Sequence, residues 1–162
     1  MTNSIYLDTN VLIALFEGKG SSHDGLWKLV SLAVGDTPAV FHTSALSFTE
    51  LLTKPYRDRN HVLARQYLLL ARSEDWLSVW PVTPGVIELT AVIRARFRLK
   101  LPDAVHVATA ATSRCQYLVT SDLGITDLMG LAHPITDESI EASIKVIRPD
   151  PISLAELAQA LS

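Results

Sequence analysis

Cysteine is almost absent from this chain of 162 residues, which contains only Cys115. A single cysteine permits no internal disulfide bond and no cysteine-based zinc site, so we expect a protein of the reducing cytoplasm. Long hydrophobic runs are also missing, because no stretch approaches the roughly 20 apolar residues that span a bilayer. The N-terminus has no basic segment of the kind that opens a secretory signal. The sequence therefore predicts a soluble protein with no membrane partner.

Positive charge is not in excess either. Fourteen Lys and Arg residues face 17 Asp and Glu residues, which gives a formal net charge of −3. This balance argues against tight, non-specific binding to long duplex DNA through a basic surface, although it allows a local basic groove. Because 48% of the residues are hydrophobic and 19% are charged, global disorder is excluded. The length is most simply that of one domain with a substantial core.

Strand-like and helix-like segments alternate along the chain, which predicts an α/β fold with a mainly parallel sheet flanked by helices. We expect strands at 5–7, 39–42, 77–80, 117–120, 132–136 and 143–147. We expect helices at 11–17, 23–34, 44–53, 61–72, 84–97, 102–114 and 154–161. Pro55 is expected to end the third helix. The core should span about 4–136, with a C-terminal extension, 137–162, packed on it.

A carboxylate at the end of the first strand is the feature around which the chain is organised. The apolar run that begins at Ile5 ends at Asp8, and Thr9 and Asn10 can both cap the helix that follows. In open α/β sheets, ligands bind at this carboxyl end of the strands. An ionised carboxylate so close to a core must be paired or metal-bound.

Three more acids lie in equivalent places. Glu50 is in the helix after the second strand, Asp103 is in the first turn of the helix that Pro102 opens, and Asp122 follows the strand that ends at Thr120. Parallel strands and the helices after them share one edge, so these acids should converge with Asp8.

Each acid also has a purely structural interpretation. Asp8 could cap a helix, and Asp122 could be a turn residue. Asp103 could be stabilised by the helix dipole, which favours a negative charge in the first turn. Glu50 could close a capping box with Ser47, but not if Ser44 is the cap.

Together, four like charges in one cleft would repel one another strongly, and bound cations relieve such repulsion. Carboxylate oxygens without cysteine suit Mg²⁺ or Mn²⁺. These ions activate water and stabilise charge at a phosphodiester. From the residues alone, the prediction is metal-assisted hydrolysis of a phosphate ester.

Four segments, in order, resemble the motifs of the PIN-domain ribonucleases, over roughly 4–135 of the chain. They are Tyr6–Ile13, Ser44–Leu51, Leu101–Ala110 and Leu118–Asp122. The resemblance implies a Rossmann-like PIN fold and a Mg²⁺- or Mn²⁺-dependent endoribonuclease. By position it places Asp8, Glu50, Asp103 and Asp122 at the catalytic metal site, with Asn10 and Thr120 as supporting polar residues.

A small PIN protein most resembles the VapC-type toxins of toxin–antitoxin pairs. That resemblance implies an RNA substrate, a homodimer and a cognate antitoxin whose tail occupies the active-site groove. One departure is the apolar Leu123-Gly124-Ile125 run after Asp122, where the family commonly has polar or aromatic residues. Asp127 could take the place of a ligand missing there.

Further candidates surround the third motif. His106 lies three residues after Asp103, on nearly the same helix face, where it could orient a carboxylate, contact a phosphate or simply pack. Four basic residues directly precede this helix and could hold RNA phosphates or form a solvated surface. They are Arg94, Arg96, Arg98 and Lys100.

Three other functions are weighed against nuclease activity. The haloacid-dehalogenase-type phosphatases resemble this chain in opening with a strand and an Asp, in the motif Asp-x-Asp-x-Thr. This chain has Asn10 in place of the second Asp and Leu12 in place of the Thr. A receiver domain would need an acidic partner beside Asp8, and none is present. A degenerate PIN fold that binds RNA or protein stays open, although all four acids are retained.

Overall fold

A central five-stranded sheet organises the computed structural model, which describes residues 3–33, 40–72 and 75–161. Its strands are β1 (Ser4–Leu7), β2 (Val40–Ser44), β3 (Leu77–Trp80), β4 (Tyr117–Val119) and β7 (Lys145–Ile147). They lie in the order β3-β2-β1-β4-β7, and every neighbouring pair is parallel. The predicted α/β class with a parallel sheet is confirmed.

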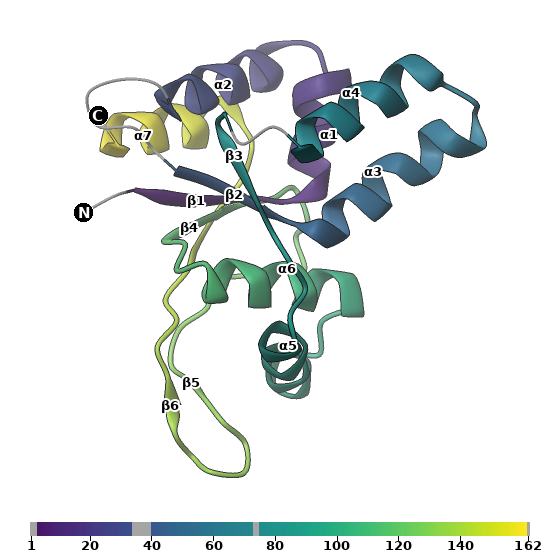
Figure 1. Cartoon of the computed structure of the whole chain (residues 1–162). Helices are drawn as coiled ribbons and strands as arrows, with labels where there is room; N and C mark the ends of the chain where they lie inside the picture. Colours follow the sequence, from purple (N-terminus) through teal and green to yellow (C-terminus); the bar gives the residue numbers. More distant parts are fainter. Residues whose placement is uncertain (1–2, 34–39, 73–74, 162) are drawn as a thin grey trace.

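Seven α-helices of the described residues flank this sheet (Figure 1). They are α1 (Thr9–Glu17), α2 (Ser21–Val30), α3 (Ala45–Arg57), α4 (His61–Arg72), α5 (Pro84–Phe97), α6 (Leu101–Thr112) and α7 (Pro151–Leu161), and a short 3-10 turn, η1 (Ser31–Ala33), follows α2. Among the helices that the structure describes, none is long and apolar enough to cross a membrane.

The sheet has a separate apolar core on each face, because successive side chains of a strand point to opposite sides. Ile5 and Leu7 of β1 pack into the core shared with α1, α2, α3, α4 and α7. Tyr6, between them, faces the core shared with α5 and α6. Both faces of β1 are therefore covered, which is the usual condition of a parallel sheet.

Two local predictions are wrong. Pro55 does not end α3, which continues to Arg57 with the proline ring buried inside it. A proline so near the end of a helix removes one hydrogen bond, and burial of the ring offsets that loss. The strand expected at 132–136 is confined to β5 (Leu131–Ala132), which pairs with the unpredicted β6 (Ser139–Ile140) in a small antiparallel hairpin. Residues 34–39, where the second predicted helix ends and the second strand begins, lie outside the described residues.

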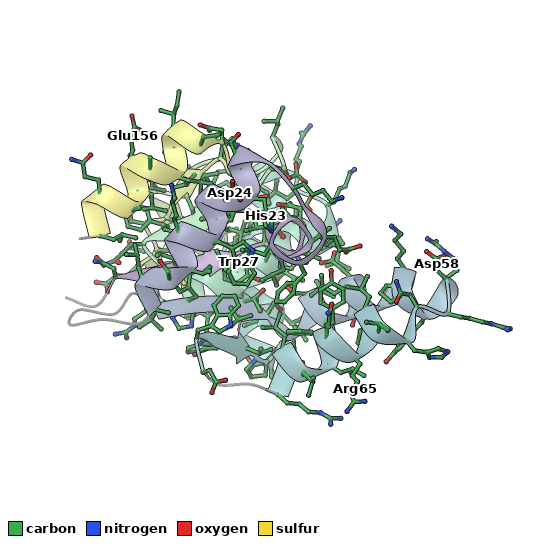
Figure 2. The ribbon with its side chains drawn as sticks, turned by 90° about the horizontal axis from the view of Figure 1, so that it is seen from above. His23, Asp24, Trp27, Asp58, Arg65 and Glu156 are labelled. Carbon is green, nitrogen blue, oxygen red and sulfur yellow. The ribbon has the colours of Figure 1, made fainter. Side chains whose placement is uncertain are left out.

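The C-terminal segment returns to the sheet and then covers α2. β7 pairs with β4 at the edge of the sheet, and α7 lies alongside α2 (Figure 2). Leu154 and Leu157 of α7 are buried in the same core as Leu26 and Leu29 of α2. The final strand and helix expected near 143–161 are thus present, and they complete one face of the core.

We expect Leu154→Ala to destabilise the protein strongly. Leu154 is 1% exposed, and deleting a buried leucine side chain costs about 2–5 kcal/mol because it leaves a cavity. Urea unfolding measures this loss in the free energy of unfolding. Ile152 is 72% exposed on the same helix, so Ile152→Ala is the matched control. Equal effects of the two changes would contradict the packing of α7 described above.

Candidate active site

The carboxyl ends of β1 and β4 meet at the middle of the sheet. Leu7 pairs with Val119, and the main-chain N–H of Asp8 donates to the Val119 carbonyl at 3.1 Å. The chain runs from β1 outward to β2 and β3, and then crosses to β4 on the other side of β1. This reversal of strand order is where open α/β sheets bind ligands. Asp8 and the loop that carries Asp122 lie directly at it.

Asp8 is 4% exposed, and its carboxylate is held by three neighbours. Oδ1 accepts from the main-chain N–H of Thr9 at 2.7 Å. Oδ2 accepts from Thr120 Oγ1 at 2.6 Å and from Asn10 Nδ2 at 2.9 Å. Asp8 does cap α1, as the structural interpretation predicts, but through Oδ1 alone. The structure brings Asn10 and Thr120 against Asp8.

Glu50 reaches this centre from α3. Its Oε2 lies 2.9 Å from His106 Nε2 and accepts a hydrogen bond from Thr9 Oγ1. Burial acts to raise the pKa of Glu50, but the hydrogen bonds from His106 and Thr9 outweigh it, so the pKa is lowered. The cap of α3 is Ser44, whose side chain accepts from the N–H of Leu46 at 3.2 Å. The capping-box interpretation of Glu50 is therefore wrong.

His106 joins buried Asp8 and half-buried Glu50 to the second core. Its Nε2 lies 3.5 Å from Asp8 Oδ1, and its Nδ1 shares a 2.7 Å hydrogen bond with the hydroxyl of fully buried Tyr6. Burial acts to lower the pKa of His106, but the hydrogen bond to Glu50 and the nearby acidic charges raise it overall. Of the interpretations left open by the sequence, the structure supports a packed residue that orients carboxylates.

Asp103 lies close enough to both Asp122 and Asp8 to interact with them electrostatically. Burial raises the pKa of Asp103, and the negative charges of Asp122 and Asp8 raise it further. Asp122 Oδ1 accepts from the N–H of Gly124 at 2.8 Å, as expected of a turn residue. The four predicted acids thus divide into two pairs. Asp8 and Glu50 are tied into one hydrogen-bonded network. Asp103 lies beside this network, and the charges of Asp122 and Asp8 raise its pKa more than the charges of His106 and Lys100 lower it.

The donor set fits a hard divalent cation in charge and chemistry. Carboxylate oxygens are the ligands that Mg²⁺ and Mn²⁺ prefer, and a cation would relieve the repulsion that raises the pKa of Asp103. The arrangement is not a closed cage, since no group of three His, Cys, Asp or Glu side chains among the described residues is placed to hold one ion. Water and substrate oxygens commonly complete the coordination of Mg²⁺.

The four predicted basic residues lie at the junction of α5 and α6, and all are exposed. Arg98 ends α5 in a left-handed conformation, with φ of 54°. Arg94 Nε donates to the Leu99 carbonyl at 3.2 Å, and Arg96 lies 5.6 Å from the centre of the Phe97 ring. Lys100 precedes α6 and lowers the pKa of Asp103. Of the four, Lys100 acts on the acidic site.

Sequence reasoning missed three residues of this region. Thr9 is the first residue of α1 rather than its cap, and its hydroxyl donates to Glu50. Tyr6 holds His106, and Arg148 donates to the main-chain carbonyl of Asp122 at 2.6 Å. Tyr6 could have been found, because a tyrosine in a buried strand needs a partner for its hydroxyl. Asp127, considered as a substitute ligand, instead accepts from the N–H of Val146 at 2.7 Å.

Comparison with known families gives one match over most of the chain. The family profile described as PIN domain matches residues 5–130. No curated protein matches the sequence.

Solved structures with the same fold share little sequence with this chain. VapC20 of Mycobacterium tuberculosis, described as a sarcin-ricin loop cleaving toxin, is 22% identical, with a TM-score of 0.57 over 70% of this chain and 86% of its own. VapBC-1 of nontypeable Haemophilus influenzae is 17% identical, with a TM-score of 0.57 over 74% and 87%. DNA-bound VapBC of Salmonella typhimurium is 16% identical, with a TM-score of 0.55 over 93% and 100%. At these identities the likeness establishes the fold.

We expect Tyr6→Phe to destabilise the protein by about 1–3 kcal/mol, because it leaves buried His106 Nδ1 without its partner. Chemical denaturation measures the change in the free energy of unfolding. Tyr56 is 58% exposed, so Tyr56→Phe is the matched control, with a change near zero. If the two variants were equally stable, the Tyr6 hydroxyl would have no part in holding His106.

Proposed function

The chain belongs to the PIN domain family, and on that premise we propose that it is a divalent-metal-dependent endoribonuclease. Its substrate is single-stranded or structured RNA, and its reaction is hydrolysis of a phosphodiester bond. One observation carries the proposal: at the strand-order reversal of the sheet, burial and the negative charges of Asp122 and Asp8 raise the pKa of Asp103, and Glu50 is hydrogen-bonded to Thr9, the residue next to Asp8. A cation and a polyanionic substrate together satisfy such a site.

The acidic residues have distinct roles in this proposal. Asp8, Asp103 and Asp122 hold one or two Mg²⁺ or Mn²⁺ ions, and Glu50 completes the site or positions the attacking water. The metal, when bound, supplies activation of that water and stabilisation of charge on the phosphate. Water oxygen bonds to phosphorus, the bond from phosphorus to the 3′-oxygen breaks, and the leaving oxygen takes a proton. The products are a 3′-hydroxyl and a 5′-phosphate.

The hydrogen bonds within the site prepare the residues for these roles. Asn10 and Thr120 fix the direction of the Asp8 carboxylate. His106 holds Glu50 in place through the 2.9 Å contact with Oε2. Because Tyr6 anchors His106 in turn, the Glu50 carboxylate is held from the interior of the protein as well as contacted by solvent.

Arg94, Arg96, Arg98 and Lys100 bind RNA phosphates beside the acidic site in this proposal. They are exposed and directly precede α6, whose first turn carries Asp103. Cations placed here offset the repulsion between a phosphate backbone and the four acids.

We also propose that the protein is the toxin of a VapC-type toxin–antitoxin pair and acts as a homodimer. The structural similarity to toxins of VapBC complexes supports this assignment. The cognate antitoxin would inhibit the toxin by placing its tail in the groove at the carboxyl ends of β1 and β4, where RNA otherwise binds.

A second candidate function is binding of RNA or protein without cleavage. The absence, among the described residues, of any group of three His, Cys, Asp or Glu side chains placed to hold one ion favours this candidate. A direct assay of cleavage separates the two functions.

The test is cleavage of a panel of RNAs by purified protein with Mn²⁺, Mg²⁺ or a chelator. We expect cleavage with either metal and none with the chelator. Asp103→Asn should reduce the rate roughly 10²- to 10³-fold, the scale of losing one electrostatic contact to a transition state. The fold should be as stable or more stable, because the change removes a charge that Asp122 and Asp8 repel.

Asp58→Asn is the matched control for this substitution. Asp58 is the residue that ends α3, at the outer end of that helix (Figure 2). Its side chain is 48% exposed. Its variant should cut RNA at the wild-type rate. Binding of RNA without cleavage under every metal condition would overturn the nuclease proposal in favour of a binding module, and normal cleavage by Asp103→Asn would remove Asp103 from the reaction.

A further inference from the structure

Arg148 lies beside the acidic site because three neighbouring strands end together. Val119 pairs with Leu7 on one side and with Ile147 on the other. The N–H of Thr120 donates to the Ile147 carbonyl at 3.1 Å. The residues that follow the three strands are therefore adjacent: Asp8 after β1, Thr120 after β4 and Arg148 after β7.

The guanidinium of Arg148 binds the main chain of the loop that carries Asp122. Nη1 donates to the carbonyls of Thr120 at 3.2 Å and Asp122 at 2.6 Å. Nη2 donates to the carbonyl of Ile125 at 2.7 Å. A planar group with donors in a fixed fork can span these carbonyls in one orientation, which a lysine ammonium cannot do.

The same loop is tied to Asp8 from its other side. Thr120 Oγ1 donates to Asp8 Oδ2 at 2.6 Å and accepts from the N–H of Asp122 at 3.0 Å. Asn10 Oδ1 accepts from the N–H of Ser121 at 3.0 Å. The loop is thus held between the Asp8 network and Arg148, and Asp122 lies in its middle.

This attachment opposes an electrostatic force. Asp103 and Asp122 repel each other, so an unrestrained loop would carry Asp122 away from the site whenever no cation is bound. Hydrogen bonds from a charged donor to main-chain carbonyls are among the stronger ones in proteins. Because both terminal nitrogens of Arg148 are engaged by the loop, its structural role differs from that of the exposed arginines of α5.

We propose that Arg148 is a positioning residue that fixes Asp122 opposite Asp8 and Asp103, and so prepares the site for a divalent cation. This inference rests on the proposed function for its catalytic consequence, but the restraint itself is a property of the metal-free protein. Residues that orient metal ligands typically change metal affinity about 10- to 100-fold when they are replaced.

The first test uses the wild-type protein with ¹⁵N-labelled arginine. A guanidinium held at three carbonyls cannot rotate freely about its Nε–Cζ bond, so Arg148 should give separate NMR signals for Nη1 and Nη2. Arg65, exposed on α4 (Figure 2), should give one averaged signal. An averaged signal from Arg148 would overturn the proposal, and this measurement requires no variant to fold.

The second test is Arg148→Lys, which keeps the charge and removes the fork, with Arg65→Lys as the matched control. Hydrogen exchange of the Asp122 and Gly124 amides should accelerate at least about 10-fold, and Mn²⁺ affinity measured by calorimetry should fall by about the same factor. The amide of Leu7 in β1 should exchange as in the wild type. In RNA cleavage, kcat should fall while KM stays unchanged.

The outcomes separate this inference from the proposed function. Wild-type rates of amide exchange in Arg148→Lys, or equal losses in Arg65→Lys, would overturn the role of Arg148, whether or not the protein cuts RNA. Conversely, a wild-type protein that cuts no RNA, but whose loop amides are released by Arg148→Lys, would retain the positioning role and lose the nuclease proposal.

Discussion

The buried carboxylate of Asp8 is the constraint on which the site depends. It lies at the end of a strand that is covered on both faces, where an unpaired charge would be very costly. Thr9, Asn10 and Thr120 supply the compensating hydrogen bonds. Thr120 is next to Asp8 only because β1 and β4 pair in parallel and in register. The sheet topology therefore decides whether the site can exist, and the site in turn places polar residues at fixed points in an otherwise apolar sequence.

The negative charges of the four acids are compensated in different ways, and this difference is the most informative feature of the site's electrostatics. Asp8 and Glu50 are neutralised by donors that belong to the protein, among them His106, which Tyr6 anchors in the second core. Asp103 has no comparable share in this network, and burial together with the charges of Asp122 and Asp8 raises its pKa. A fold selected for stability alone would not keep such repulsion. A site that must bind a cation and then a phosphate requires it, and this is the physical argument for catalysis.

The sequence predicted the order of the main strands and helices well, because each has clear hydrophobic periodicity and clear end signals. The placement of Asp8 and Asp122 at the same edge of the sheet also followed from topology alone, since parallel strands share one edge. The sequence could not show which partner each side chain would choose. Glu50 contacts Thr9 and His106 across three elements, and Arg148 reaches a loop more than 20 residues earlier in the chain. Such pairings depend on register and on side-chain reach, neither of which leaves a local pattern. The predicted end of α3 at Pro55 was wrong because burial of the proline ring overrode its local propensity to end a helix. The β5–β6 hairpin was missed because it depends on pairing between distant residues.

Calorimetric titration of the protein with Mn²⁺ is the most direct test of this account. The wild type should bind Mn²⁺ saturably, and a variant with both Asp103→Asn and Asp122→Asn should lose most of that affinity. The double change spares the hydrogen bonds from Thr9, Asn10 and Thr120 to Asp8, so the variant should remain folded, which circular dichroism checks. Saturable binding that disappears with the two carboxylates would confirm that a cation balances the charge at this edge of the sheet. Equal binding by the two proteins, or no binding by the wild type, would contradict the central claim.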